Sequence, residues 1–262
     1  MPPASVYTPF TPRHFEHEAF NTLPRLDEEN SLGLAGAIFK LFLTEEVLEK
    51  LTFNTNLYAI LSGCFKDGAR ECKRVKMKEL KVWFGIFRLM GVRKEPRVED
   101  YWRPADGVNS YHGFTEHMRL ARWQQINRYL HVTLPRVLAP DAPEENEESL
   151  AVWTEKVQWL LEHLETTSRN LRTIGSRASL DESMIQQTGR SCHTYHMPGK
   201  PISNGHKLFV IAERGYVYAL YPDTPVLTAR NPLNRVPNLS EEDITKLCRT
   251  SEIVLHLALR LA

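Results

Sequence analysis

Apolar side chains recur with a helical period between Leu34 and Ile174. They return every three or four positions in stretches around residues 38–42, 47–60, 77–90, 116–131 and 149–174. That spacing places the apolar side chains along one side of a helix, where they can pack against a core. The pattern therefore predicts a mostly helical region over this part of the chain.

Residues at the ends of these stretches support the helices. Thr44 can cap the helix that follows it, and Thr115 is the expected cap of the helix over 116–131. Gly91 is expected to end the helix over 77–90, because glycine is favoured just past a helix end. The predicted inward side chains of these last two helices are Leu80, Trp83, Phe84, Phe87 and Met90, then Leu120, Trp123, Ile126 and Leu130. Arg119, Arg122 and Arg128 are left for the other faces.

The pattern changes to short apolar runs after residue 178. Three runs rich in Val, Ile, Tyr and Phe, over residues 179–185, 206–213 and 216–221, are separated by Gly, Pro and Asn and are predicted to be strands. The last two are joined by Arg214-Gly215, a connection typical of a tight hairpin. The sequence therefore predicts an α+β protein, with a mostly helical N-terminal region followed by a three-stranded antiparallel sheet.

Composition shifts suggest four segments. Residues 1–33 are rich in proline and charge without periodicity and are expected to form a mobile arm. The helical region follows over 34–132, and an acidic, proline-rich linker is predicted over 133–148. The last segment, 149–262, holds the long helix, the strands and a further helix expected to begin near Ser240.

The overall composition excludes a membrane protein and gives no global argument for nucleic-acid binding. Of 262 residues, 42% are hydrophobic, but no apolar run approaches the length of a membrane span. The start of the chain lacks the layout of a secretion signal, so an intracellular protein without a membrane partner is expected. The net charge is +1, from 33 basic and 32 acidic side chains, so any DNA contact must come from local patches.

The four cysteines give no sign of zinc or redox chemistry. Cys64, Cys72, Cys192 and Cys248 form no C-x-x-C pair, and all four are predicted to be reduced thiols.

Carboxylates in and beside the strands are the first candidates for chemistry. Asp181 lies within the first strand, where a carboxylate is paired, at an exposed edge, or a metal ligand. Glu182 must point to the opposite face of the same strand, so the two cannot chelate one ion together without a bulge. Glu213 and Asp223 flank the ends of the hairpin strands and are expected to be solvated turn acids.

Two local basic clusters are candidates for DNA binding. The first precedes the helix over 77–90 and includes Lys73, Arg74 and Lys76, which can contact phosphates, act as an import signal, or form a solvated helix start. The second is the segment between the first two strands, which can contact a DNA backbone or be an ordinary surface loop. Its candidates are Arg190, His193, His196, Lys200 and Lys207, with Tyr195 among them.

Several motifs around the strands resemble the catalytic domain of piggyBac-type transposases. They are Asp181-Glu182, Gly189-Arg190, Met197-Pro198-Gly199-Lys200-Pro201 and Gly205-His206-Lys207. The helices from about Ala37 onward are also similar in order and spacing to those that precede the catalytic strands in that family, and the resemblance continues to Tyr221.

This resemblance implies a ribonuclease H-like fold in which three aspartates hold two divalent metal ions. Two cations about 3.5–4 Å apart stabilise the attacking and leaving oxygens of an in-line displacement at phosphorus. Asp181 matches the first of these aspartates and is the one metal ligand carried over to this chain. The second and third are expected beyond Ala262, so the resemblance implies an incomplete ribonuclease H-like unit, truncated after the start of the catalytic domain.

The functional expectation is a piggyBac transposable element-derived protein that is catalytically inactive and retains weak DNA binding. Asp181 is then a vestigial acid, and the chain needs no cofactor, although Mg²⁺ is expected for intact family members. A domesticated or decayed protein-interaction module without DNA chemistry is the alternative, and an active nuclease would need two more acids near Asp181. The expected partners are DNA and a second copy of the chain, with no small-molecule substrate. The expected location is the nucleus, otherwise the cytoplasm.

Overall fold

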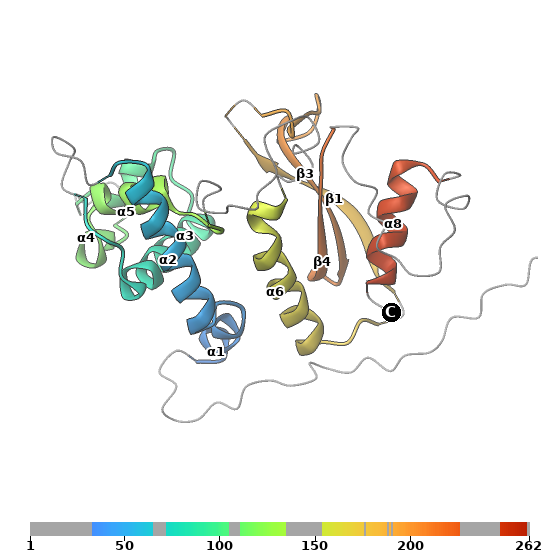
Figure 1. Ribbon diagram of the computed structural model, residues 1–262, viewed down its shortest axis with the longest axis horizontal. Helices are drawn as coiled ribbons and strands as arrows, with labels where there is room; N and C mark the ends of the chain where they lie inside the picture. Colours follow the sequence, from blue (N-terminus) through green and yellow to red (C-terminus); the bar gives the residue numbers. More distant parts are fainter. Residues whose placement is uncertain are drawn as a thin grey trace, which may run out of the picture. The chain divides into compact units, whose positions relative to one another are not determined.

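The computed structural model describes residues 33–64, 72–104, 111–134, 154–175, 177–187, 189, 191–225 and 247–260 (Figure 1). The described residues fall into two compact units. One lies within Phe39–Glu144 and is called the helical unit; the other, mainly within Glu145–Ala262, is called the sheet unit. Apart from Gly33, the predicted arm over 1–33 lies outside the described residues, as do 135–148 of the predicted linker and the expected helix start at Ser240.

The helical unit contains five helices in the described residues, preceded by α1 (Gly33–Phe42). They are α2 (Glu45–Leu61), α3 (Met77–Val92), the 3-10 helix η1 (Val98–Trp102), α4 (Phe114–His117) and α5 (Leu120–Tyr129). Thr44 caps α2 as predicted, because its side chain accepts a hydrogen bond from the Val47 amide at 3.3 Å. The core of this unit includes Leu51, Leu80, Trp83 and Ile126, one or more from each of α2, α3 and α5.

The predicted helix over 116–131 is wrong, since the chain forms two helices there. Met118 is extended, with φ −156° and ψ 137°, and Thr115 lies inside α4 rather than at a cap. The break buries the Met118 side chain and turns its carbonyl toward Trp102, whose indole N–H donates a hydrogen bond of 2.7 Å to it. A buried hydrogen bond and a buried side chain thus outweigh the local preference for a continuous helix.

The face of α3 also differs from the prediction. Leu80 and Trp83 are buried as expected, but Phe87 is 55% exposed and Ile86 is buried in its place. Phe87 still stacks on Trp83, with ring centroids 5.2 Å apart. The helix continues through Gly91 and ends at Val92.

The sheet unit is a four-stranded antiparallel sheet with helices before and after it. In chain order its elements are α6 (Glu155–Leu171), β1 (Ser179–Gln186), β2 (Tyr195–His196), β3 (Asn204–Glu213), β4 (Tyr216–Asp223) and α8 (Arg249–Leu259). The predicted strands and hairpin are present, and β3 pairs with β1, β2 and β4. Arg214 and Gly215 both have positive φ, at 50° and 82°, as the tight turn requires. The two-residue strand β2 joins the three that the sequence predicts.

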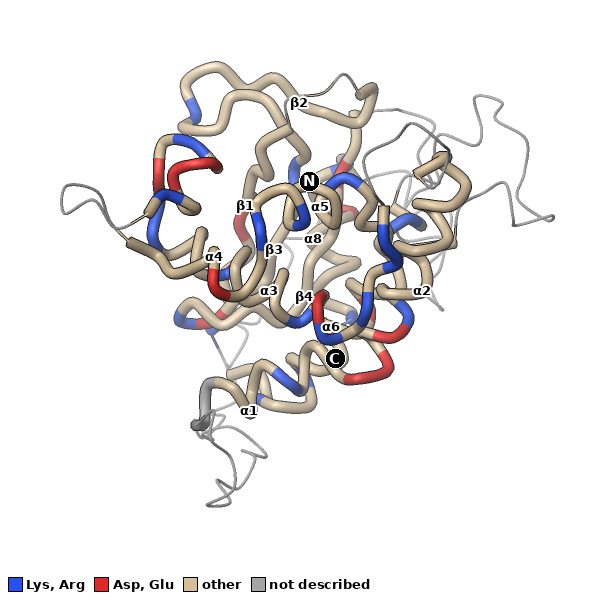
Figure 2. The backbone as a smooth tube through the Cα atoms, turned by 90° about the vertical axis from the view of Figure 1, so that its left-hand side faces the viewer, with Lys and Arg blue, Asp and Glu red and all other residues tan. Residues whose placement is uncertain are grey.

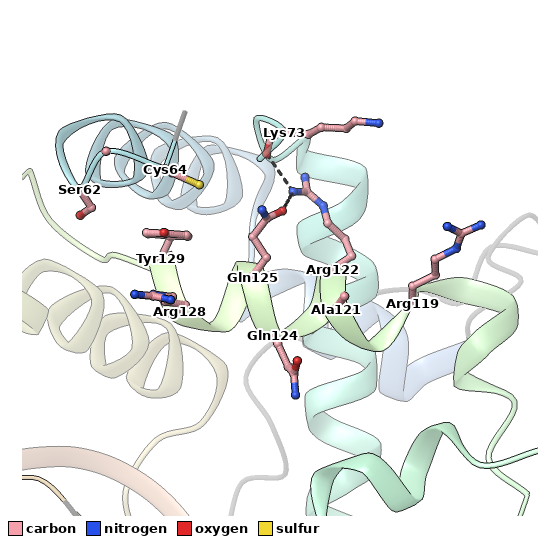
Figure 3. A pocket seen from close by; sticks show the side chains of 11 residues that line it. Ser62, Cys64, Lys73, Arg119, Ala121, Arg122, Gln124, Gln125, Arg128 and Tyr129 are labelled. Atoms are coloured by element: carbon pink, nitrogen blue, oxygen red, sulfur yellow. Dashed lines mark hydrogen bonds between the residues drawn. The ribbon is translucent and has the colours of Figure 1, made fainter. Parts of the chain in front are cut away.

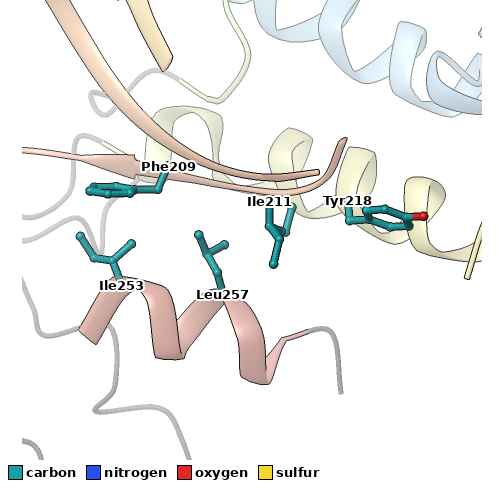
Figure 4. Close-up of a cluster of buried hydrophobic side chains, with 6 residues drawn as sticks. Phe209, Ile211, Tyr218, Ile253 and Leu257 are labelled. Atoms are coloured by element: carbon teal, nitrogen blue, oxygen red, sulfur yellow. The ribbon is translucent and has the colours of Figure 1, made fainter. Parts of the chain in front are cut away.

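The two faces of this sheet have different surroundings. One face, called the covered face, carries Phe209 and Ile211, which pack against Ile253 and Leu257 of α8 (Figure 4). From β4, the Tyr216 hydroxyl donates a hydrogen bond of 2.8 Å to the carbonyl of Ser168 in α6. The other face, called the outer face, consists of exposed and half-buried side chains, among them Ser183, Ile185, Leu208, Val210 and Leu220.

The cysteine prediction is wrong for two of the four residues. Cys64 and Cys72 form a disulfide with Cα atoms 5.8 Å apart, whereas Cys192 and Cys248 are free and exposed. Two cysteines eight residues apart match none of the short metal or redox motifs, so the sequence does not indicate the disulfide. The disulfide forms because the fold brings the residue after α2 close to the segment that precedes α3. Among the helices that the structure describes, none has the length and apolar character needed to cross a membrane.

Candidate functional site

Strand register places the four carboxylates of the sheet on different faces. Asp181 pairs with Val210, which in turn pairs with Leu220, so Asp181 lies on the outer face. Glu182 pairs with Phe209 and therefore lies on the covered face, as the alternation along a strand requires. Asp223 pairs with Lys207, and Glu213 alternates with Phe209 and Ile211 along β3, so both also lie on the covered face.

Asp181, the predicted metal ligand, is exposed and has no second acid on its face of the strands. Its carboxylate accepts a hydrogen bond of 2.7 Å from the Glu182 amide. In the part of the chain that the structure describes, no group of three or more His, Cys, Asp or Glu residues could hold a metal ion. The described residues therefore do not fit a pair of Mg²⁺ ions, and the role of Asp181 as a metal ligand stays a prediction.

Asp223 is buried rather than solvated, so that prediction is wrong. Its side chain is 2% exposed and accepts from Arg249 at 2.7 Å and from the Tyr195 hydroxyl at 2.6 Å. The oxygen that accepts from Tyr195, Oδ2, also lies 3.3 Å from the Lys207 ammonium, whereas Arg249 contacts Oδ1. Burial and the hydrogen bond to Asp223 raise the pKa of Tyr195. Arg249 follows Asp223 by 26 residues, and no local sequence signal links the two.

Glu213, also predicted to be a solvated turn acid, is buried at the other end of β3. It accepts a hydrogen bond of 3.1 Å from the Gly175 amide and lies 3.6 Å from Arg172. The three carboxylates of the covered face are thus each paired with a cation.

Lys207 connects these charges into one network, called the ion-pair cluster, which consists of Glu182, Lys200, Lys207, Asp223 and Arg249. Glu182 lies 3.3 Å from Lys200 and 3.4 Å from Lys207. The Lys207 side chain is 14% exposed, and its ammonium lies over the ring of Phe209 at 4.6 Å. Gly205 allows β3 to come this close to β1, because a Cβ there would meet the backbone carbonyl of Ile185. The Gly-x-Lys motif therefore has a structural role.

The other predicted residues of the loop before β3 are divided between interior and surface. His193 is buried, and its Nδ1 lies 2.9 Å from the Thr224 hydroxyl. Burial lowers the pKa of His193, with further contributions from His206 and Lys156. His196 and Lys200 are exposed, whereas Arg190 lies outside the described residues. The assignment of these residues to DNA binding stays a prediction.

Basic and acidic residues are interspersed along the described backbone (Figure 2). A surface that binds DNA would therefore depend on a local cluster of basic side chains. In the helical unit, Lys73, Arg74 and Lys76 are exposed in the segment that leads into α3. The guanidinium of Arg122 on α5 donates to the carbonyls of Lys73 at 2.8 Å and Arg74 at 3.1 Å. It also lies 3.0 Å from Glu79.

These contacts form one wall of a groove of about 760 Å³, called the α5 groove (Figure 3). Among the described residues, its lining consists of the basic residues Lys73, Arg119, Arg122 and Arg128, together with Ser62, Gly63, Cys64, Ala121, Gln124, Gln125 and Tyr129. Of these residues, only Lys73 is a DNA-binding candidate on the basis of the sequence. The helical period predicts that Arg119, Arg122 and Arg128 do not point into the core. Only the tertiary fold shows that they line the same groove as Lys73.

Two comparisons with known proteins bear on this arrangement. Residues 35–261 match the family described as Transposase IS4. The fold is similar to the cryo-EM structure of the piggyBac transposase synaptic complex with hairpin DNA, with a TM-score of 0.59 and 20% sequence identity. The match covers 72% of this chain and 38% of that one. The sheet unit accordingly has a ribonuclease H-like fold.

Proposed function

The chain belongs to the Transposase IS4 family, in its piggyBac type, and we propose that it binds duplex DNA without cutting or joining it. Membership of a transposase family supports DNA as the partner, as does the likeness to a transposase in complex with hairpin DNA. One observation above all supports the proposal that the chain does not cut or join DNA. Asp181 lies on the outer face, while the other carboxylates of the strands lie on the covered face and are paired with cations.

The chemical reason is the number of ligands that divalent cations need. Mg²⁺ takes oxygen ligands in octahedral geometry, and phosphoryl transfer of this kind uses two such ions. Within the described residues, Asp181 by itself supplies too few oxygens, and Glu182 cannot join it, because Glu182 faces Lys200 and Lys207 on the opposite side of β1. Family members with all three aspartates would hold the metal pair.

DNA binding is tested by fluorescence anisotropy with a labelled duplex at increasing salt. Binding that neutralises phosphates releases counterions, so affinity should fall steeply between 50 mM and 200 mM salt. Absence of binding at 50 mM, or binding that does not change with salt, would contradict the proposal.

The absence of strand cleavage is tested with supercoiled plasmid and Mg²⁺. No nicked product is expected from the wild-type chain. Mg²⁺-dependent nicking that is lost in Asp181→Ala would show an active nuclease and overturn this part of the proposal.

A second candidate function, a protein-interaction module, is favoured by the outer face. Ile185 is 53% exposed and Val217 is 37% exposed on this face of the sheet. Exposed apolar side chains of this kind can associate with a partner or with a second copy of the chain. Sedimentation velocity distinguishes the two functions: a dimer that Ile185→Lys abolishes, in a chain that does not bind DNA, would favour the interaction module.

A nuclear location is part of the same proposal, since a DNA-binding protein of a transposase family must reach DNA. Lys73, Arg74 and Lys76 are exposed and can serve as the import signal. A fluorescent fusion should accumulate in the nucleus and should lose that accumulation when all three residues are changed to Gln.

A further inference from the structure

Strand β1 lies at one end of the sheet, and among the described strands only β3 pairs with it. In an antiparallel pair, successive residues direct their backbone N–H and C=O groups alternately toward the partner strand and away from it. The Gln187 N–H donates to the Asn204 carbonyl at 3.3 Å and continues the β1–β3 register, so the odd-numbered residues of β1 face β3. The backbone groups that point away from β3, here called the β1 edge, belong to Leu180, Glu182, Met184 and Gln186.

The β1 edge has the properties of a surface to which another strand can be added. Its N–H and C=O groups recur every two residues, about 6.8 Å apart. Five of the eight residues of β1 are exposed and none is buried. The strand also contains neither Pro nor Lys, the residues that often keep an edge strand from pairing. Strand addition is therefore open to β1 unless another side chain blocks it.

Asp181 blocks the middle of the β1 edge. Its carboxylate accepts the Glu182 N–H at 2.7 Å, and this N–H is one of the donors of the edge. Asp181 is exposed, and none of the described cations lies within ion-pair distance of it. Glu182, by contrast, is balanced by Lys200 and Lys207. Within the described residues, Asp181 therefore carries the uncompensated charge of β1 and occupies a donor that an added strand would need.

The sequence of β1 favours a second copy of β1 as the added strand. Two copies can pair antiparallel along most of the strand in two registers that match the free backbone groups, over residues 179–185 or over 180–186. The first register places Glu182 directly opposite Glu182, which is unfavourable because the charges are alike. The second places Ser183 opposite Ser183 and pairs Glu182 with Met184 and Leu180 with Gln186. A net charge of +1 adds little repulsion between the copies.

We propose that the β1 edge is a strand-addition surface for β1 of a second copy, centred on Ser183, and that Asp181 keeps this surface closed. For the strands to pair, the Glu182 N–H has to leave the Asp181 carboxylate. The carboxylate then loses water at the junction of two strands without gaining a cation, which costs free energy. This role of Asp181 involves neither a metal ion nor DNA, so the inference does not depend on the proposed DNA binding.

The test compares dimer formation by Asp181→Val and Ser183→Val in sedimentation velocity. Both variants place Val at an exposed position on the same face of β1, but only the first removes the carboxylate. Asp181→Val should raise the dimer association constant about 100-fold over the wild type, because it frees one amide in each copy and a hydrogen bond to a charged group contributes about tenfold or more. Ser183→Val should associate as the wild type does. Asp181→Asn keeps the shape of the side chain without its charge and should give an intermediate constant.

A second change distinguishes pairing through the β1 edge from association through the outer face. Gln186→Pro removes an N–H of the edge but no hydrogen bond to β3, and proline is tolerated on edge strands. Added to Asp181→Val, it should return the dimer to the monomer, whereas Gln186→Ala in the same background should leave the dimer intact. Hydrogen exchange gives an independent readout. The amides of Leu180 and Met184 should exchange rapidly in the wild type and slowly in the Asp181→Val dimer.

Several outcomes would overturn the proposal. Equal dimerisation of Asp181→Val and Ser183→Val would show general apolar association, and monomers of both Asp181 variants would show that the carboxylate blocks nothing. A dimer that persists with Gln186→Pro would lie away from the β1 edge. Slow exchange of the Leu180 and Met184 amides in the monomeric wild type would show that the edge is already covered. None of these measurements involves DNA, so the failure of the proposed function and the failure of this inference are separate results.

Discussion

Asp181 and Asp223 show how the face of a strand decides the role of a carboxylate. Asp181 is exposed on the outer face and accepts a hydrogen bond from its neighbouring amide. Asp223 is buried at the end of β4 and is bound by Arg249, Lys207 and Tyr195. Of these two acids, only Asp223 has its charge compensated inside the fold, so only Asp223 should matter for stability.

We expect Asp223→Asn to lower the free energy of unfolding by about 2–3 kcal/mol. Loss of one partner of a buried ion pair costs about 3–5 kcal/mol, and the value is reduced here because Arg249 is 39% exposed. Asp181→Asn is the matched control and should change stability by less than about 0.5 kcal/mol. Urea denaturation measures the free energy of unfolding of both variants. Equal losses in the two would contradict a stabilising role for Asp223 alone.

His193 makes the stability of the sheet unit depend on pH. Burial lowers the pKa of His193 from its ordinary value of 6.5, so the folded state favours the neutral ring. The stabilisation is present above the unfolded pKa and is lost as pH falls through the folded pKa. Relative to His193→Gln, the wild type should therefore lose stability between pH 7 and pH 5 in urea titrations. A constant difference between the two proteins would show that His193 does not titrate in this range.

At the scale of elements, the entry into α3 is held at several points. The disulfide joins the end of α2 to Cys72, and Asn56 of α2 exchanges hydrogen bonds of 2.6 and 2.9 Å with the backbone of Val75. Arg122 of α5 holds the carbonyls between these two points. The groove wall is thus fixed by contacts from α2 and α5 together.

Reduction of the Cys64–Cys72 disulfide should lower the free energy of unfolding of the helical unit by about 2.5 kcal/mol. This is the loop-closure entropy for a separation of eight residues. The unit should stay folded, because Asn56 and Arg122 still hold the segment. Urea denaturation of Cys72→Ser, with Cys192→Ser as the control, measures the effect. A Cys72→Ser variant as stable as that control would contradict it.

At the scale of the whole molecule, the near balance of charge leaves little general repulsion between copies. The net charge of +1 corresponds to a sequence pI of about 7.8. A protein close to its pI associates more readily, and the exposed apolar side chains of the outer face add to this tendency.

We therefore expect self-association to be greater at pH 7.8 than at pH 6.0. Protonation of histidines at the lower pH raises the net positive charge and restores repulsion. Static light scattering at both pH values measures the effect, and Ile185→Lys should reduce the association at pH 7.8. A stable dimer at both pH values would contradict a charge-controlled association.

The sequence by itself determined the elements whose physics is local. The capped start of α2 depends on Thr44 and a neighbouring amide, and the turn between β3 and β4 depends on two adjacent residues. Strand alternation alone placed Asp181 and Glu182 on opposite faces. Periodicity, capping and turn chemistry involve residues within a few positions of one another, so a single chain shows them directly.

Only the tertiary structure decided which side chains are buried, paired or brought into one groove. Asp223 meets Arg249 across 26 residues, and Lys73 meets Arg122 across 49. Met118 leaves the helical conformation because its side chain and carbonyl are needed in the core. Contacts of this range depend on how whole elements pack, and no local pattern carries that information. The DNA-binding role of the loop before β3 stays a prediction, because neither local pattern nor the packing of these elements tests it.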